Sequence, residues 1–256
     1  KYAGILRKRN QTTQKVRFLS ELQHDLQKLG YETKVQASIS GKSKYYNLYT
    51  TNLDQAKTVF SAYYDTPIKS LHLYGYDPLD PGSNKAMKVL SAVLPSLTLL
   101  FLLMGLIAFV FLNQWTNGDI SVLDVIYALV SLGLFILVIR YRKGIVNGYN
   151  SVRNTNSILA FLELAAALSP SQKKRVAFAF TDFGALNGLG TEDLVRTLNK
   201  SNRAARLVLA DCLASSEPVV VSMKGEWPRN NDALKPLNSV SPYLSGLDYP
   251  NLLLLA

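Results

Sequence analysis

Residues 89–112 read VLSAVLPSLTLLFLLMGLIAFVFL and contain no charged side chain. At 1.5 Å per residue, a helix of this length is about 36 Å long, which is enough to cross a hydrocarbon core of about 30 Å. Pro95 falls in its first two turns, where the loss of a backbone donor is best tolerated. The stretch therefore predicts a transmembrane helix.

A second apolar stretch runs from about residue 120 to 139 and has Asp124 near its start. Its uncharged part is short for a span, and either a tilted helix or an Asp124 side chain at the membrane interface would resolve this. The alternative is an intramembrane carboxylate, which the position of Asp124 one turn from the end disfavours. The two stretches together predict a transmembrane helical hairpin.

The charges that flank the hairpin predict its orientation. The connecting loop, residues 113–123, carries Asp119 and no lysine or arginine, whereas basic residues lie outside both spans: Lys85, Lys88, Arg140, Arg142 and Lys143. The positive-inside rule places both flanks in the cytoplasm. The sequence thus predicts a multi-pass protein of the cell membrane, with two spans and a soluble domain in the cytoplasm.

Two spans return the chain to the side from which it started, so the flanking segments can fold together. Roughly 200 of the 256 residues lie outside the spans, enough for one ordinary domain. We expect residues 1–84 to form the first half of an α/β domain, residues 85–143 the hairpin, and residues 144–256 the second half.

The first half predicts an amphipathic helix followed by strands. The helix spans Thr13 to Leu29, with Gly30 as its C-cap, and its apolar side chains recur at three- and four-residue steps: Val16, Leu19, Leu22, Leu26 and Leu29. The strand candidates that follow are Glu32–Ala37, Tyr45–Thr50 and Lys57–Tyr63.

The second half alternates helices with continuous apolar strands. Helices are expected at Asn156–Leu168 and at Thr191–Leu198, the latter with Thr191 as its N-cap. The expected strands are Val176–Thr181, Arg206–Cys212, Val219–Ser222 and Asn251–Ala256. This alternation favours an α/β fold with a mainly parallel mixed sheet and helices on both faces.

Charge and cysteine content exclude some classes of function. The net charge is +10, but the basic residues are mostly scattered, and the clusters Arg7–Arg9 and Arg140–Lys143 suit contact with anionic headgroups. Nucleic-acid binding is therefore disfavoured. The single cysteine, Cys212, excludes an intramolecular disulfide and lies in an apolar run typical of a buried thiol.

Three segments, in this order, resemble the zinc-dependent aminopeptidases, a co-catalytic metallopeptidase family that includes nicastrin and nicalin. They are FSAYYDT at 60–66, NTNSILAFLELA at 154–165 and VAFAFTDFGALNGLGT at 176–191. The resemblance covers nearly all of the soluble part. It implies a zinc-exopeptidase-like fold, here as a degenerate, nicastrin- or nicalin-like member with a transmembrane hairpin insertion.

The resemblance also implies where metal ligands would lie, and the chain departs from the family at the first two positions. Active members have a histidine two residues before an aspartate, where this chain has Tyr63 and Asp65. A phenol with a pKa near 10 is a poor zinc ligand. Arg153 stands where an aspartate bridges the two metals, and its guanidinium would repel them.

The remaining family positions are also altered. Gly184 and Ala185 replace two consecutive glutamates, of which one is the general base and one a ligand. Asp211 ends a strand like the one that carries a ligand carboxylate, and is the one plausible survivor. Tyr243 replaces the last ligand, a histidine. We therefore expect no catalytic residue, no metal site and no cofactor.

No other constellation in the sequence supports catalysis. The two histidines, His24 and His72, do not form a ligand-spaced pair, and no Gly-x-Ser-x-Gly elbow is present. We expect Arg153 to pair with Asp65 or Asp211 and to replace the lost metal as a structural cation.

Three functions remain open. The favoured one is a non-catalytic, aminopeptidase-like membrane protein that serves as a binding or assembly subunit with other membrane proteins. The alternative is a residual or relocated-site membrane metallopeptidase that uses Asp65, Asp182 and Asp211. A third is a subunit of a transport or biogenesis complex in which the hairpin makes the principal contacts.

Overall fold

The structure is a computed structural model that describes residues 1–41, 43–66, 81–117, 122–141, 154–185, 188–211, 213, 221–224, 234–236 and 246–255. The chain divides into two compact units. One comprises Lys1–Pro67, Asp77–Gly82 and Asn147–Ala256, and the other Ile68–Tyr76 and Ser83–Val146. Both halves of the sequence thus contribute to the first unit.

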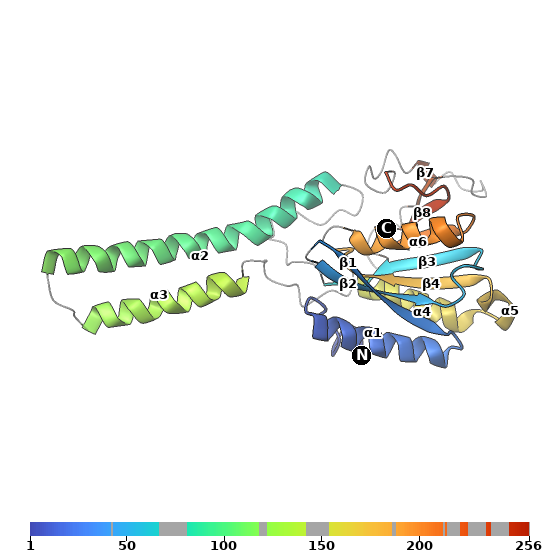
Figure 1. Cartoon of the computed structure of the whole chain (residues 1–256), viewed down its shortest axis with the longest axis horizontal. Helices are drawn as coiled ribbons and strands as arrows, with labels where there is room; N and C mark the ends of the chain where they lie inside the picture. The colour runs from blue at the N-terminus through green and yellow to red at the C-terminus, as the bar shows by residue number, and fades with distance from the viewer. Residues whose placement is uncertain are drawn as a thin grey trace. The chain divides into compact units, whose positions relative to one another are not determined.

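The first unit is built on a mixed sheet in the order β1-β2-β4-β3-β5-β8-β6-β7 (Figure 1). Strands β3, β4, β5 and β8 run parallel as a central group, with antiparallel pairs towards both sides. The strand bounds are β1 Thr33–Ser40, β2 Ser43–Thr50, β3 Thr58–Tyr63, β4 Val176–Thr181, β5 Arg206–Ala210, β6 Val221–Lys224, β7 Leu234–Pro236 and β8 Leu252–Leu255.

Helices cover both faces of this sheet. On one face, α1 (Thr12–Lys28) and α4 (Asn156–Ala167) pack on a core that includes Phe18, Ile158 and Phe178. A short helix, α5 (Pro170–Lys173), follows α4. On the other face, α6 (Leu189–Ser201) packs on a second core. The expected α/β fold, a mixed sheet between helices, is confirmed.

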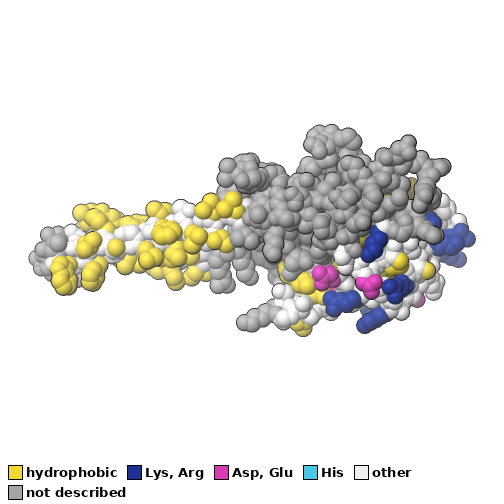
Figure 2. Space-filling view, turned by 90° about the horizontal axis from the view of Figure 1, so that it is seen from above, with side chains coloured by type: hydrophobic (Ala, Val, Ile, Leu, Met, Phe, Trp, Pro, Cys, Tyr) yellow, Lys and Arg dark blue, Asp and Glu magenta, His cyan; other side chains and the backbone are white. Residues whose placement is uncertain are grey.

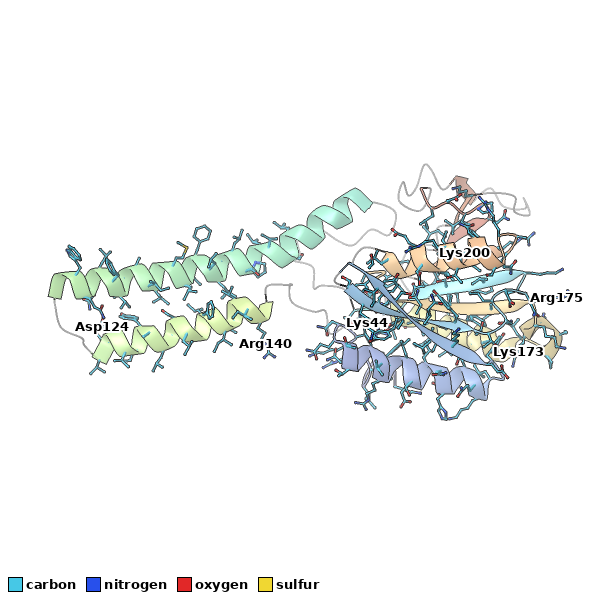
Figure 3. The ribbon with its side chains drawn as sticks, in the orientation of Figure 1. Lys44, Asp124, Arg140, Lys173, Arg175 and Lys200 are labelled. Carbon is cyan, nitrogen blue, oxygen red and sulfur yellow. The ribbon has the colours of Figure 1, made fainter. Side chains whose placement is uncertain are left out.

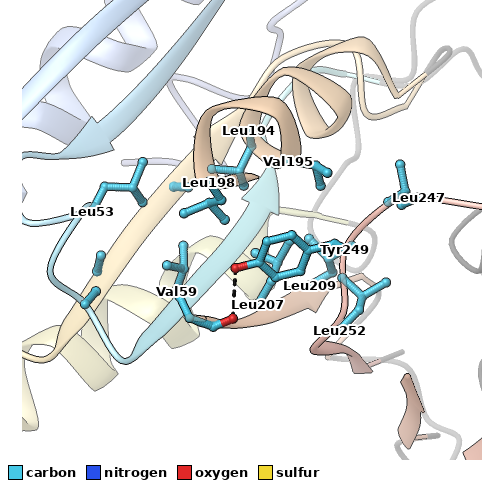
Figure 4. Close-up of a cluster of buried hydrophobic side chains, with 14 of the residues drawn as sticks. Leu53, Val59, Leu194, Val195, Leu198, Leu207, Leu209, Leu247, Tyr249 and Leu252 are labelled. Carbon is cyan, nitrogen blue, oxygen red and sulfur yellow. Dashed lines mark hydrogen bonds between the residues drawn. The ribbon is translucent and has the colours of Figure 1, made fainter. Parts of the chain in front are cut away.

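The α6 core shows why these segments form buried strands. Leu194, Val195 and Leu198 of α6 lie over Val59 of β3 and Leu207 of β5 (Figure 4). Tyr249 enters the same cluster from the chain before β8, and its buried hydroxyl donates a 2.8 Å hydrogen bond to the carbonyl of Ala205. Continuous apolar strands are stable here because both of their faces are covered.

The second unit contains two long helices, α2 (Pro81–Asn117) and α3 (Val122–Tyr141). Their segments Val93–Trp115 and Val122–Arg140 are long and apolar enough to cross a membrane, and only 6% of each is buried. Figure 2 shows their apolar side chains exposed along the unit. A hydrophobic surface of this extent is unusual for a protein in water.

The two helices are joined by a polar contact and an aromatic contact. The side-chain amide of Asn113 donates a 3.0 Å hydrogen bond to the carboxylate of Asp124. The rings of Phe109 and Tyr127 meet edge to face, with centroids 5.1 Å apart. Asp124 lies in the first turn of α3 and Arg140 in its last (Figure 3).

The structure differs from two predictions, at Val16 and at Thr191. Val16 is 49% exposed, and Lys15 and Phe18 take its place on the buried face of α1. Thr191 is not the N-cap of α6, because the helix begins at Leu189 after Gly188, which has a φ of 75°. A glycine adopts this left-handed conformation without strain. It ends the turn that leaves β4, and its N–H bonds the carbonyl of Phe183 at 2.8 Å.

Candidate functional site

The candidate site lies at the carboxyl ends of β3, β4 and β5. Tyr63 ends β3, and Asp182 and Asp211 directly follow β4 and β5. The three strands are parallel neighbours, so these residues come to one edge of the sheet. Open α/β folds place their functional sites at this edge.

Tyr63 and Asp211 are bonded to each other across neighbouring strands. The Tyr63 hydroxyl donates a 2.8 Å hydrogen bond to Oδ1 of Asp211, and both residues are only 9% exposed. The Tyr63 hydroxyl thus supplies the hydrogen-bond donor for this carboxylate oxygen. The pair therefore holds the ends of β3 and β5 together and leaves this oxygen engaged.

Asp65 is engaged with the loop that follows β4. Its Oδ1 accepts a 3.1 Å hydrogen bond from the backbone N–H of Ala185, and its carbonyl accepts a 2.6 Å bond from the side chain of Asn154. Asp65 is 2% exposed. This carboxylate thus fixes the position of the Gly184–Ala185 segment.

Gly184 has no space for a side chain. A Cβ atom at this position would lie 2.1 Å from Cβ and 2.3 Å from Cγ of Tyr63. Contacts below 3.0 Å require something to move, and the Cβ of Tyr63 is fixed by the backbone of β3. A glutamate at position 184 does not fit while Tyr63 stays in place.

Asp182 is paired with a lysine that the sequence analysis overlooked. Lys15 Nζ lies 2.5 Å from Oδ1 of Asp182, and the side chains are 7% and 0% exposed. The same Nζ lies 4.1 Å from the ring centroid of Phe183, a favourable cation–π position. Phe183 has a φ of 55°, so the turn after β4 is strained at a non-glycine residue. The pair ties this turn to α1.

A second buried cation, Arg9, links two parts of the first unit, one on each side of the segment that contains α2 and α3 in the sequence. Arg9 is 0% exposed, and its Nη2 donates to the side-chain oxygens of Asn154 at 3.0 Å and of Thr155 at 2.7 Å. Its backbone N–H donates to Oγ1 of Thr66 at 2.6 Å. Burial lowers the pKa of Arg9 to about 10, and the negative charge of Asp65 opposes this shift. The guanidinium remains charged at neutral pH.

The structure brings together Tyr63, Asp65, Gly184, Ala185 and Asp211, which family spacing had placed in one site. Arg153 and Tyr243 lie outside the described residues, as do His72 and Cys212. His24 is exposed on α1 and does not belong to the site.

In the described part of this site, each of the three carboxylates accepts from a different donor. Within the described ranges, no group of three or more histidine, cysteine, aspartate or glutamate side chains could hold a metal. Asp211 accepts from a phenol, Asp65 from a backbone amide, and Asp182 from a lysine. Zinc sites use nitrogen, sulfur and carboxylate ligands that converge on one point. Here the carboxylates turn to separate donors.

Arg9, Lys15 and Asn154 are the site residues that the sequence analysis missed. Lys15 could have been found, because it lies three and four residues before Phe18 and Leu19 on the buried face of α1. Arg9 gave no such signal, since it belongs to the basic run Arg7–Arg9, whose other members are exposed.

Comparison with known proteins finds similarity to solved structures only. No protein-family model matches, and no curated protein matches. A glutaminyl cyclase from Bacteroides thetaiotaomicron bound to N-acetylhistamine is 13% identical, with a TM-score of 0.46, over 86% of this chain and 60% of that chain. A Zn-dependent exopeptidase from Parabacteroides distasonis is 13% identical, with a TM-score of 0.44, over 85% and 59%.

A leucine aminopeptidase precursor from Bacteroides thetaiotaomicron is also similar, at 13% identity and a TM-score of 0.42, over 86% of this chain and 60% of that chain. The chain therefore spans about 60% of the length of these enzymes.

Proposed function

We propose that this chain is a non-catalytic, peptidase-like integral membrane protein whose first unit serves as a binding or assembly subunit of a membrane complex. The observation that carries the proposal is the engagement of the carboxylates at the strand ends. Asp211 accepts a hydrogen bond from the Tyr63 hydroxyl, and Asp182 accepts one from the Lys15 ammonium. Asp65 accepts one from the backbone N–H of Ala185. A hydrolytic site would need such groups free to hold metal or water.

The proposal also rests on what is missing at the turn after β4. Metal-assisted hydrolysis needs a general base beside the attacking water. Gly184 and Ala185, at the positions of the family's glutamates, cannot accept a proton through their side chains, and the space at Gly184 is filled by Tyr63. A fold can persist while its function moves elsewhere, because function resides in the site and not in the fold.

A role within the membrane is supported by α2 and α3. Their exposed apolar side chains are stable in lipid and would otherwise need a protein partner. A chain anchored in this way meets other membrane proteins in the same bilayer, which suits an assembly subunit.

The first expected result concerns metal and activity. The full chain, purified in mild detergent and dialysed against zinc-free buffer, should contain less than about 0.1 zinc per chain by elemental analysis. It should release no product from aminoacyl or N-terminal glutaminyl model substrates. Tyr63→Phe, which removes the phenol from Asp211, should give the same two results, because Asp65 and Asp182 keep their partners and no general base is added.

One or more retained zinc ions per chain, or turnover that Asp211→Asn abolishes, would contradict the proposal. Such a result would favour a residual or relocated-site membrane metallopeptidase that uses Asp65, Asp182 or Asp211. The assembly role is tested by native co-purification of the full chain. Partners that survive replacement of the two helices by an unrelated hairpin bind the first unit, and partners that are lost bind the helices.

The second expected result concerns orientation. Basic residues flank the helices on the side of the first unit, and residues 113–123 carry none, so we propose that this unit faces the cytoplasm. In a Cys212→Ser background, a reporter cysteine at Asn117 should react with an impermeant thiol reagent in intact cells. A reporter at Ser171, which is exposed on α5, should react only after lysis. The reverse pattern would show that the unit lies outside the cytoplasm.

A further inference from the structure

The two edges of the sheet differ in how they are protected against pairing. The β7 edge has a strand of three residues that ends at Pro236. Short strands and prolines are common protection for an edge. The β1 edge has a strand of eight residues with no proline, and its only charged residue is Lys34. Its pairing with β2 is one to one throughout, so no bulge interrupts it.

The hydrogen bonds around β1 show which residues direct their backbone groups to the free edge. The N–H of Thr51 bonds the carbonyl of Glu32 at 2.9 Å, so even-numbered residues of this segment bond β2. Residues along an antiparallel strand alternate in this respect. The carbonyl of Thr33 accepts from the side chain of Gln23 at 3.3 Å, as expected for a group that points away from β2.

By this alternation, Val35, Ala37 and Ile39 direct N–H and C=O away from β2. In the part of the chain that the structure describes, β1 pairs with β2 alone. Their side chains are exposed, and Ile39 reaches 74%. Ile39 lies opposite Lys44, which is labelled in Figure 3. The three residues form an apolar row whose backbone groups pair with no other described strand, and we call it the β1 edge row.

The other side of β1 is already occupied. The side chains of Gln36 and Ser38 reach Asp193 of α6 at 3.4 and 3.1 Å. These contacts hold β1 in its extended conformation. The edge is therefore preorganised for pairing, and a partner strand would not need to order it.

We propose that the β1 edge row is a homodimer interface, at which β1 of a second copy pairs antiparallel about a two-fold axis at Ala37. This register places Val35 of each copy opposite Ile39 of the other and Ala37 opposite itself. Opposite residues in an antiparallel pair share one face. The apolar row is therefore its own complement, which is why the occupant is a second copy of this chain.

The directions of the backbone N–H and C=O groups of β1 exclude the neighbouring registers of this strand pair. Residues that direct their polar groups to the edge must face residues that do the same, so the register can move only in steps that keep odd residues opposite odd ones. Centring on Gln36 would place Ile39 opposite Thr33, whose carbonyl is already bonded by Gln23. Centring on Ser38 would place Val35 opposite Gly41, beyond the end of β1. Only the Ala37 register pairs all three free residues.

Disulfide trapping in intact cells tests both the dimer and its register, with the full chain in a Cys212→Ser background. Ala37→Cys should give a covalent dimer on mild oxidation, because directly opposite residues lie about 5.5 Å apart between Cα atoms. Val35→Cys co-expressed with Ile39→Cys should do the same. Val35→Cys alone is the matched control, because two copies of residue 35 would lie well beyond disulfide reach.

A second measurement does not depend on cysteines. Ile39→Lys puts a charged side chain opposite Val35 of the second copy in place of an apolar contact. Because residue 39 is exposed in the single chain, the change should leave the thermal midpoint unchanged and reduce the dimer fraction at least tenfold by light scattering in mild detergent. No crosslink at Ala37→Cys, or one as strong in Val35→Cys alone, overturns the proposal. A dimer fraction unchanged by Ile39→Lys also overturns it. None of these results alters the zinc and activity readouts.

Discussion

Replacing Lys15 by methionine is expected to lower the free energy of unfolding by about 3–5 kcal/mol, the usual result of removing one partner from a buried ion pair. Asp182 is fully buried and would lose the ammonium that lies 2.5 Å from its Oδ1. In a chain of this size the loss corresponds to a fall of roughly 6–20 °C in thermal midpoint. Pulse proteolysis of the purified chain in a urea series gives the free energy directly.

Two further variants test whether the effect comes from the buried pair of Lys15 and Asp182. Lys15→Met combined with Asp182→Asn should recover part of the loss, because the neutral amide costs less to bury than an unpaired carboxylate. Arg203→Met removes a cation from the exposed pair with Asp248, whose side chains are 61% and 85% exposed. That change should cost no more than about 1 kcal/mol. A silent Lys15→Met would mean that the pair does not hold the turn after β4.

The sequence was sufficient to predict most of the fold because its central strands, such as β4 and β5, are apolar on both faces. Val176–Thr181 is a strand at the residues expected, since a continuous apolar run between helices has few alternatives. The start of α6 was misplaced because Gly188, which ends the preceding turn, was not recognised as its N-cap. Caps depend on local φ angles, which residue type predicts only in part.

The sequence predicted the site residues at the strand ends but not the cations that pair with them, and the difference has a physical cause. Family spacing placed Tyr63, Asp65, Gly184, Ala185 and Asp211 together, since each lies at a strand end or in a turn that follows one. The spacing could not show that Lys15 reaches Asp182 across 167 residues, or that Arg9 reaches Asn154 across 145. Such pairs depend on how α1 packs in the folded chain. The position of a single basic residue in the sequence does not indicate which residue it will contact. The substitute cation was sought at Arg153, and Arg9 and Lys15 are the buried cations among the described residues of the site.

Replacing Arg9 by methionine is expected to have an effect of similar size, about 3–5 kcal/mol, because several buried polar groups would lose one partner together. Asn154 and Thr155 would each lose a hydrogen bond from Nη2. Asn154 also donates to the carbonyl of Asp65, so the loss should spread to the segment that ends at Thr66. Hydrogen exchange should become faster at residues 63–66 and 154–157 than in β5.

Two further variants separate the causes of this effect. Arg9→Lys keeps the charge and loses the planar fork, so a stability between those of wild type and Arg9→Met would assign part of the effect to hydrogen-bond geometry. Lys8→Met is the control, because Lys8 is exposed beside Arg9 and should change stability by no more than about 0.5 kcal/mol. If Arg9→Met costs as little as Lys8→Met, or if exchange rises equally in every strand, Arg9 does not join the ends of the interrupted unit. The expected pattern would instead show that Arg9 bridges Thr66 and Asn154, between which the chain leaves the first unit to form α2 and α3.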